Sequence, residues 1–141
     1  MRGMPNSIRT LLNSAAFALT ARIALTCAFW WGGLTKLLDF QGAVGEAQHF
    51  GLAPAAIVAS LTIVVELGAS ALLIIGRWTW FAAGTLGIFT ALATLIAHSF
   101  WAFNDPAERF REFNIFLEHI GLIGGLALAA VLAAKSDEGR K

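Results

Sequence analysis

Six polar side chains that can move a proton or hold a polar ligand group lie within apolar stretches of this 141-residue sequence. A charged side chain at the centre of a membrane helix costs about 2.5–3.5 kcal/mol, so such residues usually pair or function. Guanidinium and ammonium groups donate hydrogen bonds, carboxylates accept them, and imidazoles do either. The six residues are Arg22, Lys36, Glu66, His98, Glu118 and His119.

Glu66 is the deepest of these charges. It precedes Gly76 by ten residues, which is about 15 Å of helix and close to the middle of a bilayer. A lone carboxylate can be neutralised by protonation, whereas a lone arginine stays charged. The sequence therefore predicts that Glu66 lies inside the fold and pairs with Arg22. Such a pair could be a structural link between two helices or part of a working site, and the sequence leaves both open.

Four of the six residues are expected at similar depth near the outer end of the fold. They are Lys36, His98, Glu118 and His119. Together they could form a site that relays a proton to the outside. Lys36 could instead extend to the lipid headgroups, and His98, close to Trp101, could be an ordinary interfacial residue.

The elements that position these residues are four apolar stretches, at about 15–38, 53–75, 78–101 and 113–134. Each has the roughly 20 residues that a helix needs to cross a bilayer. None alternates with period two, and a backbone in lipid must satisfy its own hydrogen bonds. We expect one all-α domain over residues 1–141, an antiparallel bundle of four transmembrane helices.

Composition supports this fold and excludes other classes. Hydrophobic residues make up 57% of the chain and charged residues 13%, and the net charge of +1 gives no reason to expect nucleic acid as a partner. The single cysteine, Cys27, excludes an intramolecular disulfide. No spaced set of ligands predicts a metal site, and no cofactor motif is recognisable.

The breaks between the stretches are expected to be loops. The segment Asp39–Leu52 is rich in glycine, Gly76-Arg77 is a tight turn, and Asn104-Asp105-Pro106 opens a third loop that includes Glu112. With both termini on one side, six lysines and arginines lie on that side and three on the other, which predicts cytoplasmic termini. The six are Arg2, Arg9, Arg77, Lys135, Arg140 and Lys141.

Small residues line one face of the later helices. Gly84, Gly87, Ala91 and Thr94 share a face of the third stretch, and Asn114, Glu118, Gly121 and Gly125 share a face of the fourth. These faces are expected to point inward, with Gly121 and Gly125 in close contact with another helix.

The order of several short motifs resembles the DoxX family of small four-helix bacterial membrane proteins. The motifs are an early arginine, Gly33-Leu34-Thr35-Lys36-Leu37, Phe50-Gly51-Leu52-Ala53-Pro54, Glu66-Leu67-Gly68, Ile75-Gly76-Arg77 and His98-Ser99-Phe100-Trp101. The resemblance implies a multi-pass protein of the bacterial inner membrane. It also implies association with quinol oxidase, thiosulfate:quinone oxidoreductase or oxidative-stress assemblies. Relatives often have Lys-Asn where this chain has Glu118-His119.

Three functions follow as hypotheses. The chain could be a membrane subunit of a quinone-linked oxidoreductase or redox-stress complex, with quinone at Arg22, Lys36, Glu66 and His98 and electrons from partner subunits. It could instead be a non-catalytic assembly protein, including one that forms a homo-oligomer, or a small pathway for protons or solutes. A quinone-sized pocket between Trp30, Trp101 and His98 would favour the first, and a fully paired core the second.

Overall fold

The structure, a computed structural model, describes residues 3–138 of the chain. Within this range the protein consists of helices joined by short connections. The elements are α1 (Asn6–Leu12), α2 (Ala15–Leu25), α3 (Cys27–Leu38), α4 (Phe40–His49), α5 (Ala55–Ile75), α6 (Thr79–Ala97), the 3-10 helix η1 (Phe100–Ala102) and α7 (Pro106–Glu138). The predicted all-α class is confirmed. Arg2, Arg140 and Lys141, which contributed to the predicted orientation, lie outside the described residues.

Three of the described helical segments are long and apolar enough to cross a membrane. They are Ala55–Ile75, Thr79–Ala102 and Pro106–Ser136. The first predicted span is divided into α2 and α3, which meet at a bend of 55° and make a fourth candidate span only when they are counted together. The fold is thus an all-helical membrane protein with three or four candidate spans.

The bend between α2 and α3 is centred on Thr26. This residue has no exposed surface, and its hydroxyl donates to the carbonyl of Arg22 at 2.8 Å. A threonine that bonds back to the preceding turn in this way tends to bend a helix. The apolar composition of 15–38 predicted the length of the segment but gave no indication of the bend.

The turn between α5 and α6 is as tight as predicted. Gly76 ends α5 in the left-handed conformation, with a φ of 76°, which glycine adopts without a steric penalty. Helices α5 and α6 consequently run antiparallel, and the core forms where they meet α3 and α7. Its most buried members are Leu73, Ala82, Ala83, Leu86 and Leu126, and Phe29 joins them from α3.

Two segments expected to be loops are helical. Helix α4 occupies most of Asp39–Leu52, because the Asp39 carboxylate accepts a hydrogen bond from the Gly42 amide at 2.9 Å and caps the helix. Helix α7 begins at Pro106, where Asp105 accepts a bond from the amide of Glu108 at 2.9 Å. As a consequence, Glu112 belongs to the first part of α7.

The predicted inward faces of α6 and α7 need correction. Gly84 is exposed, and the buried residues of α6 are Thr79, Ala82, Ala83, Leu86, Thr90 and Thr94. A Cβ added at Gly121 would meet nothing within 4 Å, while one at Gly125 would lie 3.1 Å from Leu25 of α2. Only Gly125 therefore makes the close contact expected of both glycines.

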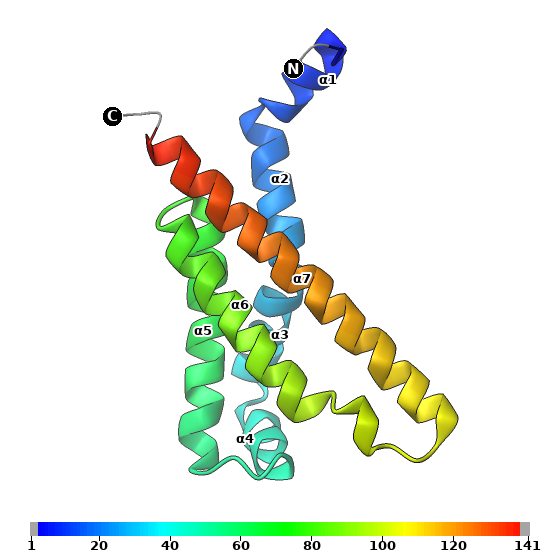
Figure 1. The fold of residues 1–141 in the computed structure, drawn as a ribbon. Coiled ribbons are helices and arrows are strands. Elements are labelled where there is room, and N and C mark those ends of the chain that lie inside the picture. Colours follow the sequence, from blue (N-terminus) through cyan, green and yellow to red (C-terminus); the bar gives the residue numbers. More distant parts are fainter. Residues whose placement is uncertain (1–2, 139–141) are drawn as a thin grey trace.

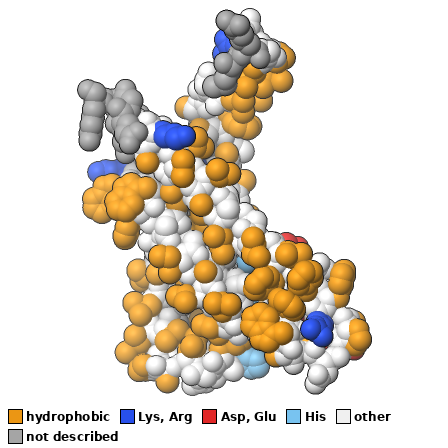
Figure 2. Space-filling model, in the orientation of Figure 1, with side chains coloured by type: hydrophobic (Ala, Val, Ile, Leu, Met, Phe, Trp, Pro, Cys, Tyr) orange, Lys and Arg blue, Asp and Glu red, His pale blue; other side chains and the backbone are white. Residues whose placement is uncertain are grey.

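Both ends of the described chain lie at one end of the molecule, and α4 and the α6–α7 connection lie at the other (Figure 1). Helix α7 runs as a long diagonal beside α6 and passes in front of α2 (Figure 1). Hydrophobic side chains cover most of the face seen in Figure 2, as expected for a surface in contact with lipid.

Candidate functional site

Glu66 projects from the buried face of α5. It is only 6% exposed, as predicted, and it shares this face with Ala59, Ile63, Ala69 and Leu73. Its Oε1 lies 3.5 Å from Nζ of Lys36 on α3. Because the other residues of this face are small or apolar, the ion pair is held in surroundings where charges interact strongly.

Lys36 also faces a second carboxylate. Its Nζ lies 3.9 Å from Oε2 of Glu46 on α4, and the Glu46 side chain is about half exposed. The ammonium group thus lies between a buried acid and an acid near the surface. Lys36 is turned toward the interior of the protein. The alternative that its side chain only extends to the lipid headgroups is therefore wrong.

Glycines on α3 make this meeting possible. A Cβ added at Gly33 would lie 2.8 Å from Cγ of Leu67 and 3.0 Å from Cβ of Glu66. Helices α3 and α5 are therefore in close contact at this level. Lys36 lies one helical turn beyond Gly33, so its side chain reaches the Glu66 carboxylate.

The predicted pairing of Arg22 with Glu66 is wrong. The Arg22 guanidinium packs against Gly76, at the other end of α5. Ten residues separate Gly76 from Glu66, which is about 15 Å of helix. Because α2–α3 runs antiparallel to α5, Arg22 is opposite Gly76 and Gly33 is opposite Glu66, so Lys36 is the cation that Glu66 meets.

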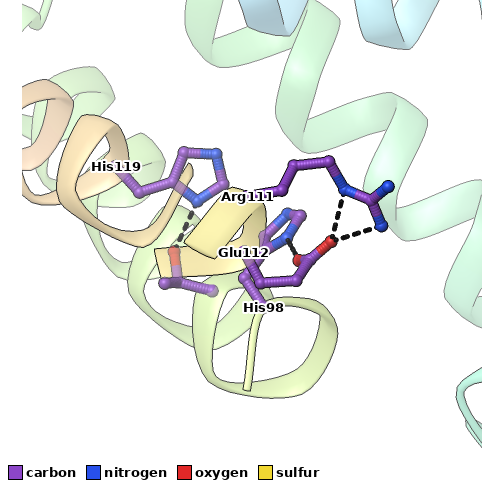
Figure 3. A network of polar contacts seen from close by, with 5 residues as sticks. His98, Arg111, Glu112 and His119 are labelled. Carbon is purple, nitrogen blue, oxygen red and sulfur yellow. Dashed lines mark hydrogen bonds and ion pairs between the residues drawn. The ribbon is translucent and has the colours of Figure 1, made fainter. Parts of the chain in front are cut away.

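A second polar cluster joins α6 to α7 (Figure 3). Nδ1 of His98 lies 2.8 Å from Oε2 of Glu112, and Arg111 donates to Oε1 of Glu112 from two nitrogens at 3.3 and 3.4 Å. Nδ1 of His119 lies 2.7 Å from Oγ1 of Thr94. The rings of His98 and His119 are 5.0 Å apart between centroids in an edge-to-face arrangement.

The predicted outer site of Lys36, His98, Glu118 and His119 is only partly assembled. His98 and His119 come together, but the exposed Glu118 is not the carboxylate that bonds to His98. Glu112, which is 8% exposed, takes that role. Sequence reasoning missed Glu112 because it was assigned to a loop; its spacing of seven residues from His119, two turns along one helix face, was the available signal.

Both clusters contribute to one cavity of about 460 Å³. Its ionisable lining residues are Lys36, Glu46, Glu66, His98 and His119, and Thr62 and Thr90 add hydroxyl groups. Most of the wall is apolar, including Phe29, Phe89, Leu92, Ala93 and Leu122. His98 lines it, but neither Trp30 nor Trp101 does, so this cavity is not the pocket between Trp30, Trp101 and His98 that would have favoured the quinone hypothesis. Within residues 3–136, no group of three or more His, Cys, Asp or Glu side chains is placed to hold a metal ion.

Comparison with known proteins identifies the family. The model of the DoxX family matches residues 17–99, more than half of the chain. The chain belongs to the DoxX family. It is also similar to the inner membrane protein YphA of Escherichia coli (strain K12), with 26% identity over 113 residues that cover 80% of each chain. No solved structure matches it. These relationships and the apolar helices identify a multi-pass protein of the inner membrane.

The DoxX match covers the first polar cluster and only part of the second. It includes Lys36, Glu66 and His98, and it ends before Glu112, Glu118 and His119 on α7. Helix α7 of this DoxX chain therefore completes the cavity with side chains that lie outside the matched segment.

Proposed function

We propose that this DoxX-family protein is the membrane subunit of a quinone-linked oxidoreductase or redox-stress complex, and that its cavity binds a quinone headgroup. The observation that carries the proposal is the position of Lys36 in a largely apolar cavity of about 460 Å³. Sites for small apolar ligands have mostly hydrophobic walls and a few polar groups that orient the ligand. The Lys36 ammonium can donate to a quinone carbonyl, and the aromatic and aliphatic walls suit the ring.

Electrons are expected from a partner subunit. The sequence has no motif for flavin, haem or an iron–sulfur cluster, so the chain would contribute the binding site and routes for protons. Two such routes leave the cavity: Glu66, Lys36 and the half-exposed Glu46 form one, and His98, Glu112 and Arg111 form the other.

We further propose that α2 and α3 together form one bent span, so that the chain crosses the membrane four times with both termini in the cytoplasm. The distribution of lysine and arginine in the sequence supports this orientation. The cavity, close to α4 and the α6–α7 connection, would then open in the outer half of the bilayer.

One observation favours a second function, that of a non-catalytic assembly protein. The ion pair between Lys36 and Glu66 links α3 to α5, and buried ionic groups can fix how helices align. In that case the cavity would have no ligand of its own, so measured quinone binding distinguishes the two functions.

The test is equilibrium binding of a water-soluble, short-chain benzoquinone to the purified protein in detergent, measured by isothermal titration calorimetry. Ala93 lines the cavity. Ala91, two residues earlier on α6 and therefore on the opposite side of the helix, does not line it. We expect Ala93→Phe to weaken binding by about tenfold or more, which is 1.4 kcal/mol, and Ala91→Phe to leave it unchanged. Failure of the wild-type protein to bind, or equal binding by both variants, would reject the proposal.

A further inference from the structure

The hydrogen bonds of Thr94 determine which nitrogen of His119 carries a proton. Oγ1 of Thr94 lies 2.6 Å from the carbonyl oxygen of Thr90, and a carbonyl can only accept, so the hydroxyl proton is used there. Nδ1 of His119, at 2.7 Å from the same Oγ1, must therefore be the donor of its bond. A neutral imidazole has one N–H, which leaves Nε2 of His119 as an acceptor.

The same reasoning applies to His98. Glu112 receives two hydrogen bonds from the Arg111 guanidinium, which favours its charged form, and a carboxylate can only accept. Nδ1 of His98, at 2.8 Å from Glu112, is therefore the donor. In the neutral form of this ring Nε2 is left as an acceptor, and the side chains of residues 3–136 form no hydrogen bond to this atom.

The polar groups that line the cavity consequently differ in what they offer a ligand. Lys36 supplies N–H donors, whereas His98 and His119 each offer a ring nitrogen with a free lone pair. An oxidised quinone carries only carbonyl acceptors, so it can bond to Lys36 but not to the neutral imidazoles. A hydroquinone carries hydroxyl groups, which can donate to an imidazole nitrogen and also accept from an ammonium group.

We infer that the cavity selects the hydroquinone form of its ligand, with a hydroxyl donating to Nε2 of His98 and with Glu112 as the positioning residue that fixes the His98 tautomer. The inference rests on the proposed quinone-binding function and extends it to the redox state of the ligand. Glu66 and Lys36 would hold the opposite side of the ring.

The arrangement also suits His98 for accepting the hydroxyl proton. In that step the hydroxyl O–H bond breaks, an N–H bond forms at Nε2, and the products are a bound hydroquinone monoanion and a His98 imidazolium. No electrons leave the ligand in this step. Glu112, at 2.8 Å from the other ring nitrogen, would stabilise the imidazolium charge.

The experiment compares the reduced and oxidised forms of one short-chain ubiquinone, titrated without oxygen into the purified full-length protein. We expect the wild-type protein to bind the reduced form about tenfold more tightly, the effect of one net hydrogen bond. His98→Phe should remove this preference. Glu112→Gln should reduce it, because the amide can donate as well as accept and so permits the other His98 tautomer. Glu118→Gln, an exposed acid on the same helix, is the matched control and should leave the preference intact.

The outcomes separate the two proposals. If neither form binds, the quinone function itself fails. If both forms bind equally to the wild-type protein, or if Glu112→Gln keeps the full preference, the function stands and the inference is overturned. Should the Glu112 variant not fold, the nitrogen chemical shifts of the His98 ring in the wild-type protein decide the point: protonated Nδ1 supports the inference and protonated Nε2 overturns it.

Discussion

The Lys36 ammonium lies 3.5 Å from the carboxylate of Glu66, and this contact joins the last turn of α3 to the middle of α5. Side chains of both residues are shielded, with 21% and 8% exposure. The pair therefore brings together two charges whose isolation in the membrane would be costly, and both side chains line the cavity, while Oε2 of Glu66 is buried without a hydrogen-bond partner among the described residues.

The first prediction concerns this pair. Lys36→Met leaves Glu66 buried without its cation, and Glu66→Gln leaves Lys36 without its nearest acid, so each change should destabilise the protein. The double variant should recover part of the loss, with a coupling free energy of about 0.5–3 kcal/mol. Thermal unfolding in detergent of the wild type, both single variants and the double variant measures this coupling.

Arg22 supplies the control for that cycle. Its guanidinium is at the level of Gly76, about 15 Å of helix from Glu66, and side chains this far apart are usually independent. The effects of Arg22→Gln and Glu66→Gln should therefore add within about 0.5 kcal/mol. Strong coupling between these two changes would contradict the arrangement of α2 against α5.

The second prediction separates two glycines that look equivalent in the sequence. Gly33→Ala places a methyl group 2.8 Å from Leu67 and should cost about 1–3 kcal/mol through overpacking. Gly121→Ala meets nothing within 4 Å and should leave stability unchanged or raise it by up to about 1 kcal/mol, since alanine favours the helix. Melting temperatures in detergent check both. An equal loss of stability in Gly33→Ala and Gly121→Ala would mean that another part of the protein packs closely against α7 at Gly121.

Much of the fold could be predicted because the bilayer imposes a simple length and polarity rule. The apolar stretches around 53–75 and 78–101 and the turn at Gly76 were predicted from composition alone, and they correspond closely to α5 and α6. Helix α4 was missed because Gly42, Gly45 and Gly51 suggest a loop, whereas the cap by Asp39 and the burial of Ala43 and Ala47 stabilise a helix.

The candidate site was harder to predict, because pairing depends on which residues face each other across helices. Depth alone allowed Arg22 or Lys36 to meet Glu66, and the antiparallel alignment of α3 with α5 selects Lys36. Likewise, Asn104-Asp105-Pro106 correctly marks a break, but α7 begins directly after it and carries Glu112 to His98. Such contacts depend on tertiary packing, which local sequence patterns do not determine.

The third prediction tests the proposed topology. Reporters fused after Lys141 and inserted at Gly45, where α4 is exposed, should be found in opposite compartments, the first in the cytoplasm and the second outside it. A reporter at Arg77 should share the compartment of the C-terminal fusion and is the internal control. Reporters after Lys141 and at Gly45 in one compartment would mean that α5, α6 and α7 do not all cross the membrane. A reporter at the N-terminus should be cytoplasmic, and finding it in the compartment of the Gly45 reporter would mean that α2 and α3 do not form a single span.

The fourth prediction connects the cap of α4 to the cavity. The Asp39 carboxylate accepts the Gly42 amide hydrogen at 2.9 Å, and Ala43, Glu46 and Ala47 on the same helix line the cavity. Asp39→Ala should cost α4 about 1 kcal/mol, because an amide at the start of the helix loses its partner. Hydrogen exchange of the amides of residues 40–49 should become about fivefold faster.

Asp39→Asn is the matched variant for this cap, because asparagine also accepts at the N-cap, and it should keep slow exchange in α4. Asp105→Ala is the second control, since Asp105 caps α7 at Glu108 and is not part of the cavity wall. Its effect should be confined to the first turn of α7.

Quinone affinity should fall in Asp39→Ala only, because Glu46 and the alanines of α4 hold their places in the wall only while the helix is formed. Equal exchange in Asp39→Ala and the wild type would show that packing of Ala43 and Ala47 against α5 maintains α4 without its cap.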